Sequence, residues 1–314
     1  MGEKTATREA YGKALAALGK TDERIVALDA DLSKSTKTAD FAAVCPERFF
    51  NAGIAEQNMA GVAAGLAACG KIPFISTFAV FAAGRAFEQI RNSIAYPGLN
   101  VKIAATHAGI TVGEDGGSHQ AIEDIALMRV LPGMSVIVPA DGVEAASAVG
   151  VLAQHEGPAY LRLGRLATPQ VHEDDYEFVL GKGVLLREGV DIAIFACGMM
   201  VAPALQAARL LEESGVSAAV ANISTIKPLD EELIVRLASS CGAAVSAEEH
   251  SVIGGLGGAL AECLAENCPV PFGRVGLADR FGQSGSPAEL LRHYGLTEED
   301  IARKCREVLA KKRR

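Results

Sequence analysis

Two histidines, two acidic residues and four glycines lie between Thr106 and Gln120, in the stretch T-H-A-G-I-T-V-G-E-D-G-G-S-H-Q. Histidine and carboxylate side chains transfer protons near neutral pH, and glycine lets the backbone approach a ligand closely. His107 and His119, with Glu114 and Asp115 between them, therefore suggest a site that handles protons. A metal site is disfavoured, because no third ligand lies at a suitable spacing.

Glu56 is a second candidate, because it stands in N-A-G-I-A-E-Q-N-M at the start of an otherwise apolar helix pattern. An acid at this position either compensates the helix dipole or is a partly buried carboxylate with a chemical role. Phe78 and Phe81 lie three residues apart. That spacing is typical of a packed core, and it also suits a stacking surface for a flat heterocycle.

The elements that must position these residues follow from the hydrophobic pattern. Short Val- and Ile-rich runs predict strands at 25–29, 73–78, 101–106, 135–139 and 159–163. Helix-period segments lie between them, near 7–18, 54–69, 80–95, 119–129 and 142–155. Apolar strands separated by helices indicate an α/β fold with a mainly parallel sheet that is covered on both faces.

Residues 166–180 interrupt the alternation with polar, acidic and proline residues, and we interpret them as a linker. Strands are expected again at 191–195, 216–222, 243–249 and 271–276, followed by a last helix from about 297 to 311. The glycines in V-I-G-G-L-G-G-A-L fit a dinucleotide loop poorly and indicate tight strand-to-helix packing. We predict two α/β domains, 1–165 and a smaller one at 181–314, because 314 residues is about twice the usual domain size.

In open parallel sheets, ligands bind at the carboxyl ends of the strands. This rule selects the loops after Asp29, Thr77, Thr106 and Leu163. These loops lead into D-L-S-K-S-T, F-A-V-F, the histidine stretch and G-R, so the sequence predicts that four polar or aromatic clusters meet at one edge.

Composition restricts the class of partner and the compartment. The formal net charge of −8 argues against nucleic acid, because phosphate binding needs a basic face, and Lys311 to Arg314 are best explained as a solvated helix end. The seven cysteines are scattered without a C-x-x-C pair, which is typical of free thiols in a reducing compartment. No apolar run is long enough to span a bilayer, so we expect a cytoplasmic protein that binds neither membrane nor nucleic acid.

Several of these motifs together resemble transketolases, and most closely the C-terminal half of transketolase made as a separate subunit. They are D-L-S-K-S, G-I-A-E-Q-N-M, F-I-S-T-F-A-V-F, the G-E-D-G-G-S-H-Q block and L-G-R, in that order. The resemblance runs from about Arg8 to the end of the chain. It implies a pyrimidine-binding domain for thiamine diphosphate followed by a transketolase C-terminal domain.

The resemblance also implies roles for individual residues. Glu56 matches the glutamate that hydrogen-bonds N1′ of the aminopyrimidine, and a carboxyl screened from water can share a proton there. Phe78 and Phe81 match the aromatic wall around the pyrimidine ring, although the A-A-G-R turn after Phe81 is one residue longer than in many relatives. His107, Asp115 and His119 match residues that contact the hydroxyls of the sugar substrate and handle protons as its C–C bond breaks, which gives both histidines a catalytic role. Arg8, Ser35 and Arg165 match positions that hold the phosphate of the substrate.

One family motif is missing from the sequence. Transketolases bind the diphosphate and its Mg²⁺ or Ca²⁺ through G-D-G followed by an asparagine, but no G-D-G occurs here and no asparagine lies between Asn100 and Asn222. The resemblance therefore implies an N-terminal partner subunit that carries this motif, in an α2β2 heterotetramer with a homodimeric core. Two other thiamine diphosphate enzymes remain as alternatives, a deoxyxylulose-phosphate-type synthase and a 2-oxo acid dehydrogenase E1 β subunit. A non-catalytic subunit is the alternative from another class.

Overall fold

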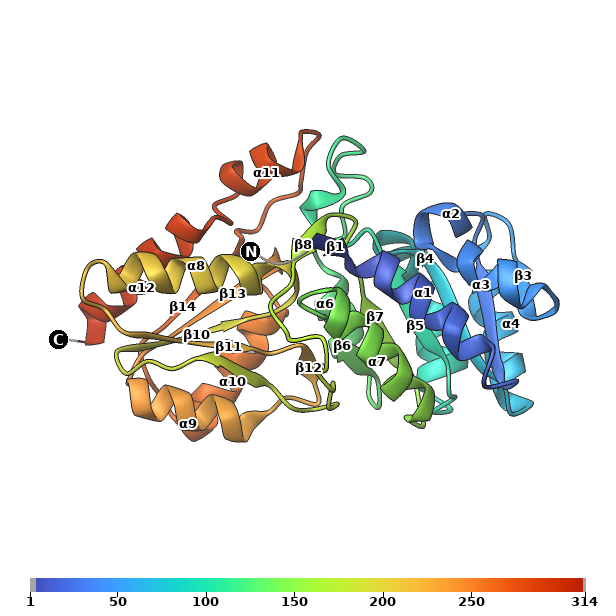
Figure 1. The fold of residues 1–314 in the computed structure, drawn as a ribbon, viewed down its shortest axis with the longest axis horizontal. Helices are drawn as coiled ribbons and strands as arrows, with labels where there is room; N and C mark the ends of the chain where they lie inside the picture. The colour runs from blue at the N-terminus through green and yellow to red at the C-terminus, as the bar shows by residue number, and fades with distance from the viewer. Residues whose placement is uncertain (1–3, 313–314) are drawn as a thin grey trace.

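The computed structural model describes residues 4–312 and shows two α/β lobes side by side (Figure 1). The first lobe, blue to green, is built on a seven-stranded sheet in the order β12-β6-β7-β5-β4-β2-β3. All of its neighbouring strands are parallel except β12 against β6. The strands are β2 Ile25–Asp29, β3 Phe49–Asn51, β4 Ile72–Phe78, β5 Lys102–Thr106, β6 Ser135–Ile137, β7 Ala159–Arg162 and β12 Thr225–Lys227.

Helices cover both faces of this sheet, as the sequence predicts. They are α1 Thr7–Gly19, α2 Ser33–Thr36, α3 Thr38–Val44, α4 Glu56–Ala68, α5 Phe87–Gln89, α6 Asp124–Arg129 and α7 Gly142–Gln154. Short 3₁₀ turns η1 Pro46–Arg48 and η4 Ile110–Val112 and π-helical turns η2 Phe81–Arg85 and η3 Ile90–Ala95 complete the lobe. Alternate residues of β2 pack on opposite sides: Ile25 joins the core under α1 and α7, and Val26 the core under α4.

The second lobe has five strands in the order β14-β13-β10-β11-β9, with only β9 antiparallel to its neighbour. In Figure 1 α8 and α12 lie on one side of this sheet, and α9 and α10 on the other. The strands are β9 Val184–Arg187, β10 Ile192–Ala196, β11 Ala218–Asn222, β13 Ala244–Ser251 and β14 Phe272–Leu277. The helical segments are η5 Gly198–Met200, α8 Val201–Glu212, α9 Glu231–Cys241, α10 Leu256–Asn267, α11 Pro287–His293 and α12 Glu298–Lys312.

Two short strands join parts of the chain that the sequence keeps apart. Residues 166–180, expected to form a linker, contain β8 Ala167–Pro169, which pairs with β1 Lys4–Ala6. Downstream of β8, Asp141 Oδ2 accepts the backbone N–H groups of Val171 and His172 at 2.7 and 2.9 Å. Strand β12 follows β11 of the second lobe but extends the first sheet. The two lobes are therefore connected by shared sheet structure as well as by the chain.

The structure has a strand at each predicted strand position, but two predicted helices are wrong in detail. The helix expected at 119–129 begins only at Asp124. The residues before it are not helical, because Ala121 forms a bridge with Ala108 and its carbonyl accepts the Gly109 N–H at 2.8 Å. The helix expected at 80–95 contains two π-helical turns. In the first, the Ala86 N–H donates to the Phe81 carbonyl at 3.1 Å, and in the second the Tyr96 N–H donates to the Arg91 carbonyl at 2.9 Å.

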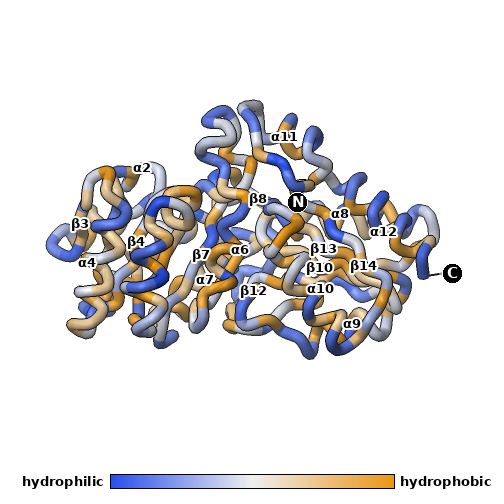
Figure 2. Tube along the Cα trace, turned by 180° about the vertical axis from the view of Figure 1, so that it is seen from behind, coloured by the Kyte–Doolittle hydropathy of each residue, from blue (hydrophilic) through white to orange (hydrophobic). Residues whose placement is uncertain are grey.

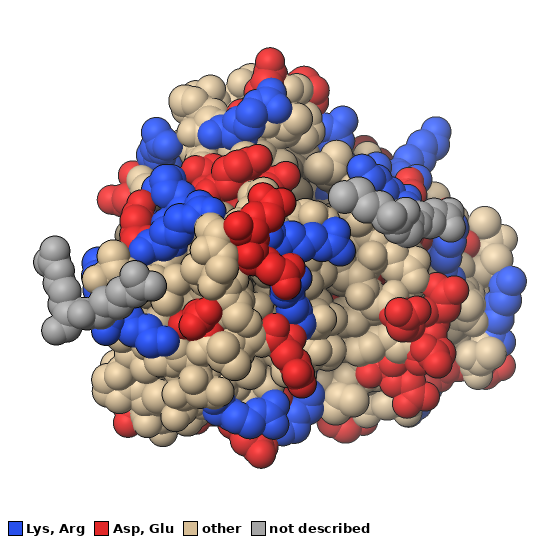
Figure 3. Space-filling view, turned by 60° about the vertical axis from the view of Figure 1, so that its left-hand side comes forward, with Lys and Arg blue, Asp and Glu red and all other residues tan. Residues whose placement is uncertain are grey.

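Hydrophobic and charged residues are distributed over both lobes (Figure 2, Figure 3). Figure 2 shows hydrophobic stretches running through the strands and helices of both lobes, and hydrophilic stretches mainly in their connections. On the face in Figure 3, Lys and Arg are interspersed with Asp and Glu, so no wholly basic surface is present there. Among residues 4–312, no helix is long and apolar enough to cross a membrane.

Candidate functional site

The four strands selected by the sequence are neighbours in the first sheet, in the order β7-β5-β4-β2. Their carboxyl ends meet at one edge, because parallel strands run in register, with Asp29 beside Ser76 and Phe78 beside Thr106. The segments after these strands carry Ser35, Phe81, His107, Asp115, His119 and Arg165, and Phe78 ends β4. Glu56 instead follows β3, and Arg8 lies in α1. The edge of the sheet is therefore the candidate site.

Phe78, Phe81 and the two histidines form an aromatic cluster at this edge. The rings of Phe78 and Phe81 are nearly parallel, with centroids 5.9 Å apart. His107 stacks on Phe78 at 3.9 Å, and His119 contacts Phe81 edge-on at 5.5 Å. Phe78 is buried and Phe81 is half-buried, so the cluster has a wall inside the protein and an accessible surface.

His107 has an unusual backbone conformation. Its φ of +56° lies in the left-handed region, which non-glycine residues seldom adopt and which often marks a functional position. Its Nδ1 lies 3.0 Å from Thr106 Oγ1, and the side chain is almost completely buried. Burial, followed by the charges of Arg8 and Arg165, lowers the pKa of His107 from 6.5 to about 3. His107 is therefore a neutral hydrogen-bonding group at physiological pH.

The depressed pKa of His107 predicts a pH dependence of stability. The unfolded chain binds this proton below about pH 6.5 and the folded chain only near pH 3. The free energy of unfolding should therefore fall as pH decreases from 6.5 towards 3, and the His107→Gln variant should lose part of this slope. Denaturant titrations of both proteins at several pH values measure it. An unchanged slope in the variant, or a His107 resonance that titrates near pH 6.5, would contradict the prediction.

Glu56 begins α4 with its side chain only 1% exposed, so it is a buried carboxylate. Arg85 Nη1 donates to both of its oxygens, at 2.8 and 2.9 Å. The same guanidinium lies over the ring of Phe81, with its carbon 4.5 Å from the ring centroid. A flat, N–H-donating group thus lies between the carboxylate and the phenyl ring.

The π-helical turn η2 explains how Arg85 reaches this position. A π-turn accommodates one more residue than an α-helical turn. The A-A-G-R segment lies in this turn. Sequence analysis did not select Arg85, although a basic residue in the apolar stretch V-F-A-A-G-R-A-F was a usable signal.

The residues around Glu56 fit the aminopyrimidine of thiamine diphosphate. An aminopyrimidine is flat and nitrogen-rich, as the guanidinium is, and its ring nitrogen can share a proton with a buried carboxylate. Phe81 provides a face on which it can stack. Within residues 4–312, no group of three or more His, Cys, Asp or Glu side chains is arranged so that it could hold a metal ion.

Arg8, Ser35 and Arg165 surround a positively charged part of the same edge. Arg8 Nη1 donates to the Ser35 carbonyl at 2.6 Å. Burial, with the nearby Arg165, lowers the pKa of Arg8, although the charge of Glu9 opposes this. Arg165 donates to the Val112 carbonyl and lies 3.4 Å from Glu114. Two cations held close together suit an anionic group of a substrate, such as phosphate.

Asp29 organises the loop that carries Ser35. Its buried carboxylate accepts the Leu32 N–H at 2.5 Å and the hydroxyls of Thr36 and Thr38 at 2.6 and 2.9 Å. Burial raises the pKa of Asp29 despite these bonds. Sequence analysis used Asp29 only as a strand end, so this supporting role is new information from the structure.

His119 lies in an irregular loop, where its Nδ1 is 3.0 Å from Ser118 Oγ. The helix that was expected to begin here starts five residues later, at Asp124. Asp115 is exposed at the tip of a turn closed by the Gly116 N–H and the Gly113 carbonyl. Among the described residues it forms no hydrogen bond or ion pair, so the chain does not itself join Asp115 to the two histidines.

A buried ion pair that sequence analysis missed lies beneath the histidine loop. Arg162, at the end of β7, donates to Asp124 from Nε at 2.8 Å and from Nη2 at 3.1 Å. The same Nη2 also reaches the carbonyls of Ala121 and Glu249. The only signals available were an arginine inside the predicted strand 159–163 and an aspartate in the earlier helix pattern 119–129.

Comparisons with known proteins agree with this geometry. Residues 3–170 match the family model "Transketolase, pyrimidine binding domain", and residues 181–301 match "Transketolase, C-terminal domain". The chain is 52% identical to a "Putative transketolase C-terminal section" of Methanocaldococcus jannaschii over 97% of this chain and 96% of that protein. It is 47% identical to a "6-deoxy-6-sulfo-D-fructose transketolase subunit" of a Clostridium species, over 97% of this chain and 95% of that protein.

A solved structure described as "Split gene transketolase, inactive beta4 tetramer" is also similar. Its TM-score is 0.92 at 59% identity, and the match covers 98% of this chain and 99% of that one. The similarity therefore extends over both lobes and includes the candidate site.

Proposed function

This chain belongs to the transketolase family, and we propose that it is the C-terminal subunit of a two-chain transketolase. In this proposal it acts with thiamine diphosphate in the cytoplasm and transfers a two-carbon ketol unit from a ketose phosphate to an aldose phosphate. An N-terminal subunit completes the site by binding the diphosphate and its Mg²⁺ or Ca²⁺.

The observation that carries the proposal is the arrangement of Glu56, Arg85 and Phe81. A buried carboxylate faces a planar N–H donor that is stacked on a phenyl ring, next to two histidines and an anion-binding cluster. This combination supports the binding of a cofactor that takes a proton at one ring nitrogen, with a phosphorylated sugar bound next to it. No G-D-G motif accompanies it in the sequence.

Each residue has a physical task in this proposal. When bound, thiamine diphosphate supplies the stabilised carbanion that carbon–carbon bond cleavage needs. Glu56 holds a proton at the pyrimidine N1′, while Phe78 and Phe81 orient the ring and exclude water. His107, neutral because of its low pKa, exchanges hydrogen bonds with sugar hydroxyls. His119 and Asp115 also contact hydroxyls of the sugar.

Arg8, Ser35 and Arg165 hold the anionic end of the substrate. Both arginines remain charged at neutral pH, and a planar guanidinium binds tetrahedral anions through two parallel N–H groups. Phosphate and sulfonate present similar oxygens to such a cluster. One relative is described as a 6-deoxy-6-sulfo-D-fructose transketolase subunit, so both classes of donor are worth testing.

The surface beside Glu56 exposes apolar side chains that a partner subunit could cover. β3 and α4 lie at the outer end of the first lobe, away from the second (Figure 1). Phe50, Ile54 and Val62 are exposed there by 46%, 78% and 44%, which is a large apolar exposure for a free surface. We propose that the N-terminal subunit covers it, in an α2β2 heterotetramer with a homodimeric core of this chain.

The proposal predicts that activity requires both subunits. The chain alone should not transfer ketol units from xylulose 5-phosphate to ribose 5-phosphate, even with thiamine diphosphate and Mg²⁺, because the diphosphate site is missing. Adding the candidate N-terminal subunit should produce activity, and a coupled assay of glyceraldehyde 3-phosphate measures it. The split-gene relative is described as inactive as a β4 tetramer, which agrees with this expectation.

Full activity of the chain alone would disprove the subunit proposal. If the mixture shows no ketol transfer, consumption of glyceraldehyde 3-phosphate in the presence of pyruvate tests the deoxyxylulose-phosphate-type alternative. Reduction of an electron acceptor in the presence of pyruvate tests the 2-oxo acid dehydrogenase alternative. A mixture that binds thiamine diphosphate but turns over none of these substrates would favour a non-catalytic subunit.

Arg85 should compete with the cofactor for Glu56. Its guanidinium must leave the carboxylate before N1′ can approach, so Arg85→Ala should tighten binding of thiamine diphosphate to the assembled enzyme. We expect at most about a fivefold decrease in Kd, because ion pairs with a solvent-exposed partner contribute roughly 0.2–1 kcal/mol. Isothermal titration calorimetry measures the change.

Arg91→Ala is the matched control, because Arg91 is exposed on the neighbouring π-helical turn and donates to Asn92. Its Kd should equal that of the unmodified enzyme. Weaker binding in Arg85→Ala than in Arg91→Ala would show instead that Arg85 helps to hold the cofactor.

A further inference from the structure

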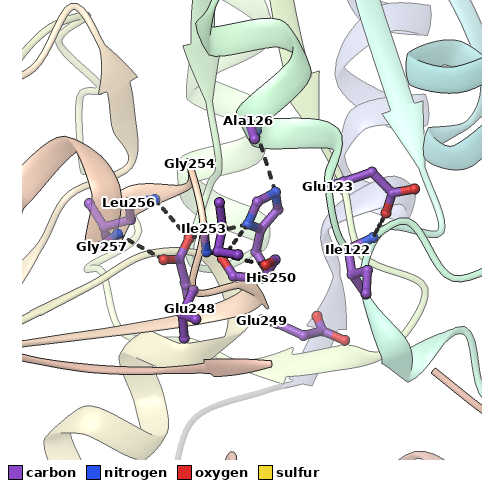
Figure 4. A network of polar contacts seen from close by, with 12 residues as sticks. Ile122, Glu123, Ala126, Glu248, Glu249, His250, Ile253, Gly254, Leu256 and Gly257 are labelled. Atoms are coloured by element: carbon purple, nitrogen blue, oxygen red, sulfur yellow. Dashed lines mark hydrogen bonds and ion pairs between the residues drawn. The ribbon is translucent and has the colours of Figure 1, made fainter. Parts of the chain in front are cut away.

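Two adjacent glutamates near the end of β13 are both buried, Glu248 completely and Glu249 with 5% exposed. Because neighbouring residues of a strand point to opposite faces, their carboxylates are directed apart, as Figure 4 shows. Glu248 accepts the N–H groups of Leu256 and Gly257 at 2.7 and 2.8 Å, at the start of α10. Glu248 thus stabilises the second lobe from within.

Glu249 faces the first lobe instead. Its Oε1 accepts the backbone N–H of Thr111 at 2.7 Å. Its carboxylate also lies against Gly109, where a Cβ atom would overlap it, and Gly109 adopts a φ of +79° that favours glycine. Arg162 Nη2 donates to the Glu249 carbonyl at 3.0 Å, so the backbone of Glu249 is fixed as well.

The turn that Glu249 holds is η4, Ile110–Val112, in the middle of the histidine stretch. Val112 follows Thr111 directly, and its carbonyl accepts a hydrogen bond from Arg165. His107 lies three residues before the turn, in a left-handed conformation that its surroundings must maintain. The position of the Thr111 N–H therefore affects both an anion-binding arginine and a histidine of the site.

The second lobe also fixes the other end of this loop. Gln120 Nε2 donates to the carbonyls of Ile110, Gly113 and Gln283 at 3.1, 3.3 and 2.9 Å. The contact with Gln283 keeps the loop against the segment before α11. The second lobe thus holds the histidine loop at several places. At the turn itself, Glu249 accepts the Thr111 N–H and Met199 Sδ lies 3.6 Å from Thr111 Oγ1.

We infer that Glu249 is a positioning residue for the substrate site: the second lobe uses its carboxylate to hold turn η4, and through that turn orients Arg165 and His107. The inference rests on the proposed function for its substrate. It gives the second lobe a role in sugar binding, although none of the predicted site residues lies in that lobe. Burial raises the pKa of Glu249, whereas Arg162 and the hydrogen bonds from Thr111 lower it. The role requires an oxygen that accepts the Thr111 N–H.

Three variants test the role of Glu249 in the enzyme assembled with its N-terminal subunit. Glu249→Ala should lower kcat/KM for xylulose 5-phosphate about 10- to 100-fold, mainly by raising KM, because displacement of a site by about 1 Å costs this much. Glu249→Gln keeps an oxygen that can accept the Thr111 N–H, so it should restore most of that loss. Glu248→Ala is the matched control: it removes an equally buried carboxylate, and its kcat/KM should change less than about threefold.

A second measurement does not depend on ketol transfer. Hydrogen–deuterium exchange of the peptide containing residues 108–114 should accelerate in Glu249→Ala but not in Glu248→Ala or Glu249→Gln. Unchanged exchange in Glu249→Ala, or equal losses of kcat/KM in Glu249→Ala and Glu248→Ala, would overturn the inference. If the unmodified assembly shows no ketol transfer, the proposed function fails, and the exchange measurement still decides whether Glu249 holds the turn.

Discussion

Glu56→Gln should lower ketol transfer by the assembled enzyme by about 10²- to 10⁴-fold, the usual effect of removing a group that exchanges a proton in catalysis. The substitution preserves the size of the side chain and an oxygen that can accept from Arg85, so the surrounding side chains should keep their positions. What is lost is the ability to share a proton with the pyrimidine nitrogen. The measurement is kcat with xylulose 5-phosphate and ribose 5-phosphate at saturating thiamine diphosphate.

Glu88→Gln is the matched control, because Glu88 is an exposed carboxylate of the same lobe that accepts only from its neighbours Gln89 and Asn92. Its kcat should equal that of the unmodified enzyme. Thermal unfolding of Glu56→Gln should differ little from that of Glu88→Gln, which separates lost chemistry from lost structure. Near-normal turnover in Glu56→Gln would remove the assigned role.

Arg162→Met should destabilise the chain by about 3–5 kcal/mol, because it leaves the buried carboxylate of Asp124 without its cation. Burial raises the pKa of Asp124, but the charge and hydrogen bonds of Arg162 outweigh it and hold that pKa below its usual value. The pair is therefore ionised at neutral pH. The apparent Tm should fall by about 10 °C, since 1 kcal/mol corresponds to roughly 2–4 °C in a protein of this size class.

The double variant Asp124→Leu, Arg162→Met tests the cause of this loss. Replacing both ions removes the uncompensated charge, and such replacements are often neutral or stabilising. The double variant should therefore recover part of the lost Tm, although the hydrogen bond from Tyr160 to Asp124 is also removed. A Tm of Arg162→Met within 2 °C of the unmodified chain would show that water enters and solvates Asp124.

Much of the fold and site was predictable because it depends on local patterns. Strands such as 25–29 are apolar on both sides, so a parallel sheet covered on both faces is their stable arrangement. Parallel strands bring their carboxyl ends together, so the loops after Asp29, Phe78, Thr106 and Arg162 had to meet. Residue types at those ends then indicated the chemistry.

Other features depend on contacts that no local pattern contains. The residues at 119–123 are not helical because Ala121 pairs with the loop at 108–109, and this contact overrides the helix period of the segment. β12 follows the second lobe in sequence and joins the first sheet, because a short strand pairs wherever an unpaired edge is available.

The sequence by itself therefore determined the α/β class and indicated candidate site residues such as Glu56 and His107. Only the tertiary structure decided which groups contact one another in and around the site. Arg85 donates to Glu56, and Arg162 pairs with Asp124. Glu249 accepts the backbone N–H of Thr111, which lies 138 residues earlier in the chain. The physical reason is that hydrophobic periodicity acts over a few residues, whereas a buried charge or N–H group must find a partner wherever the fold brings one.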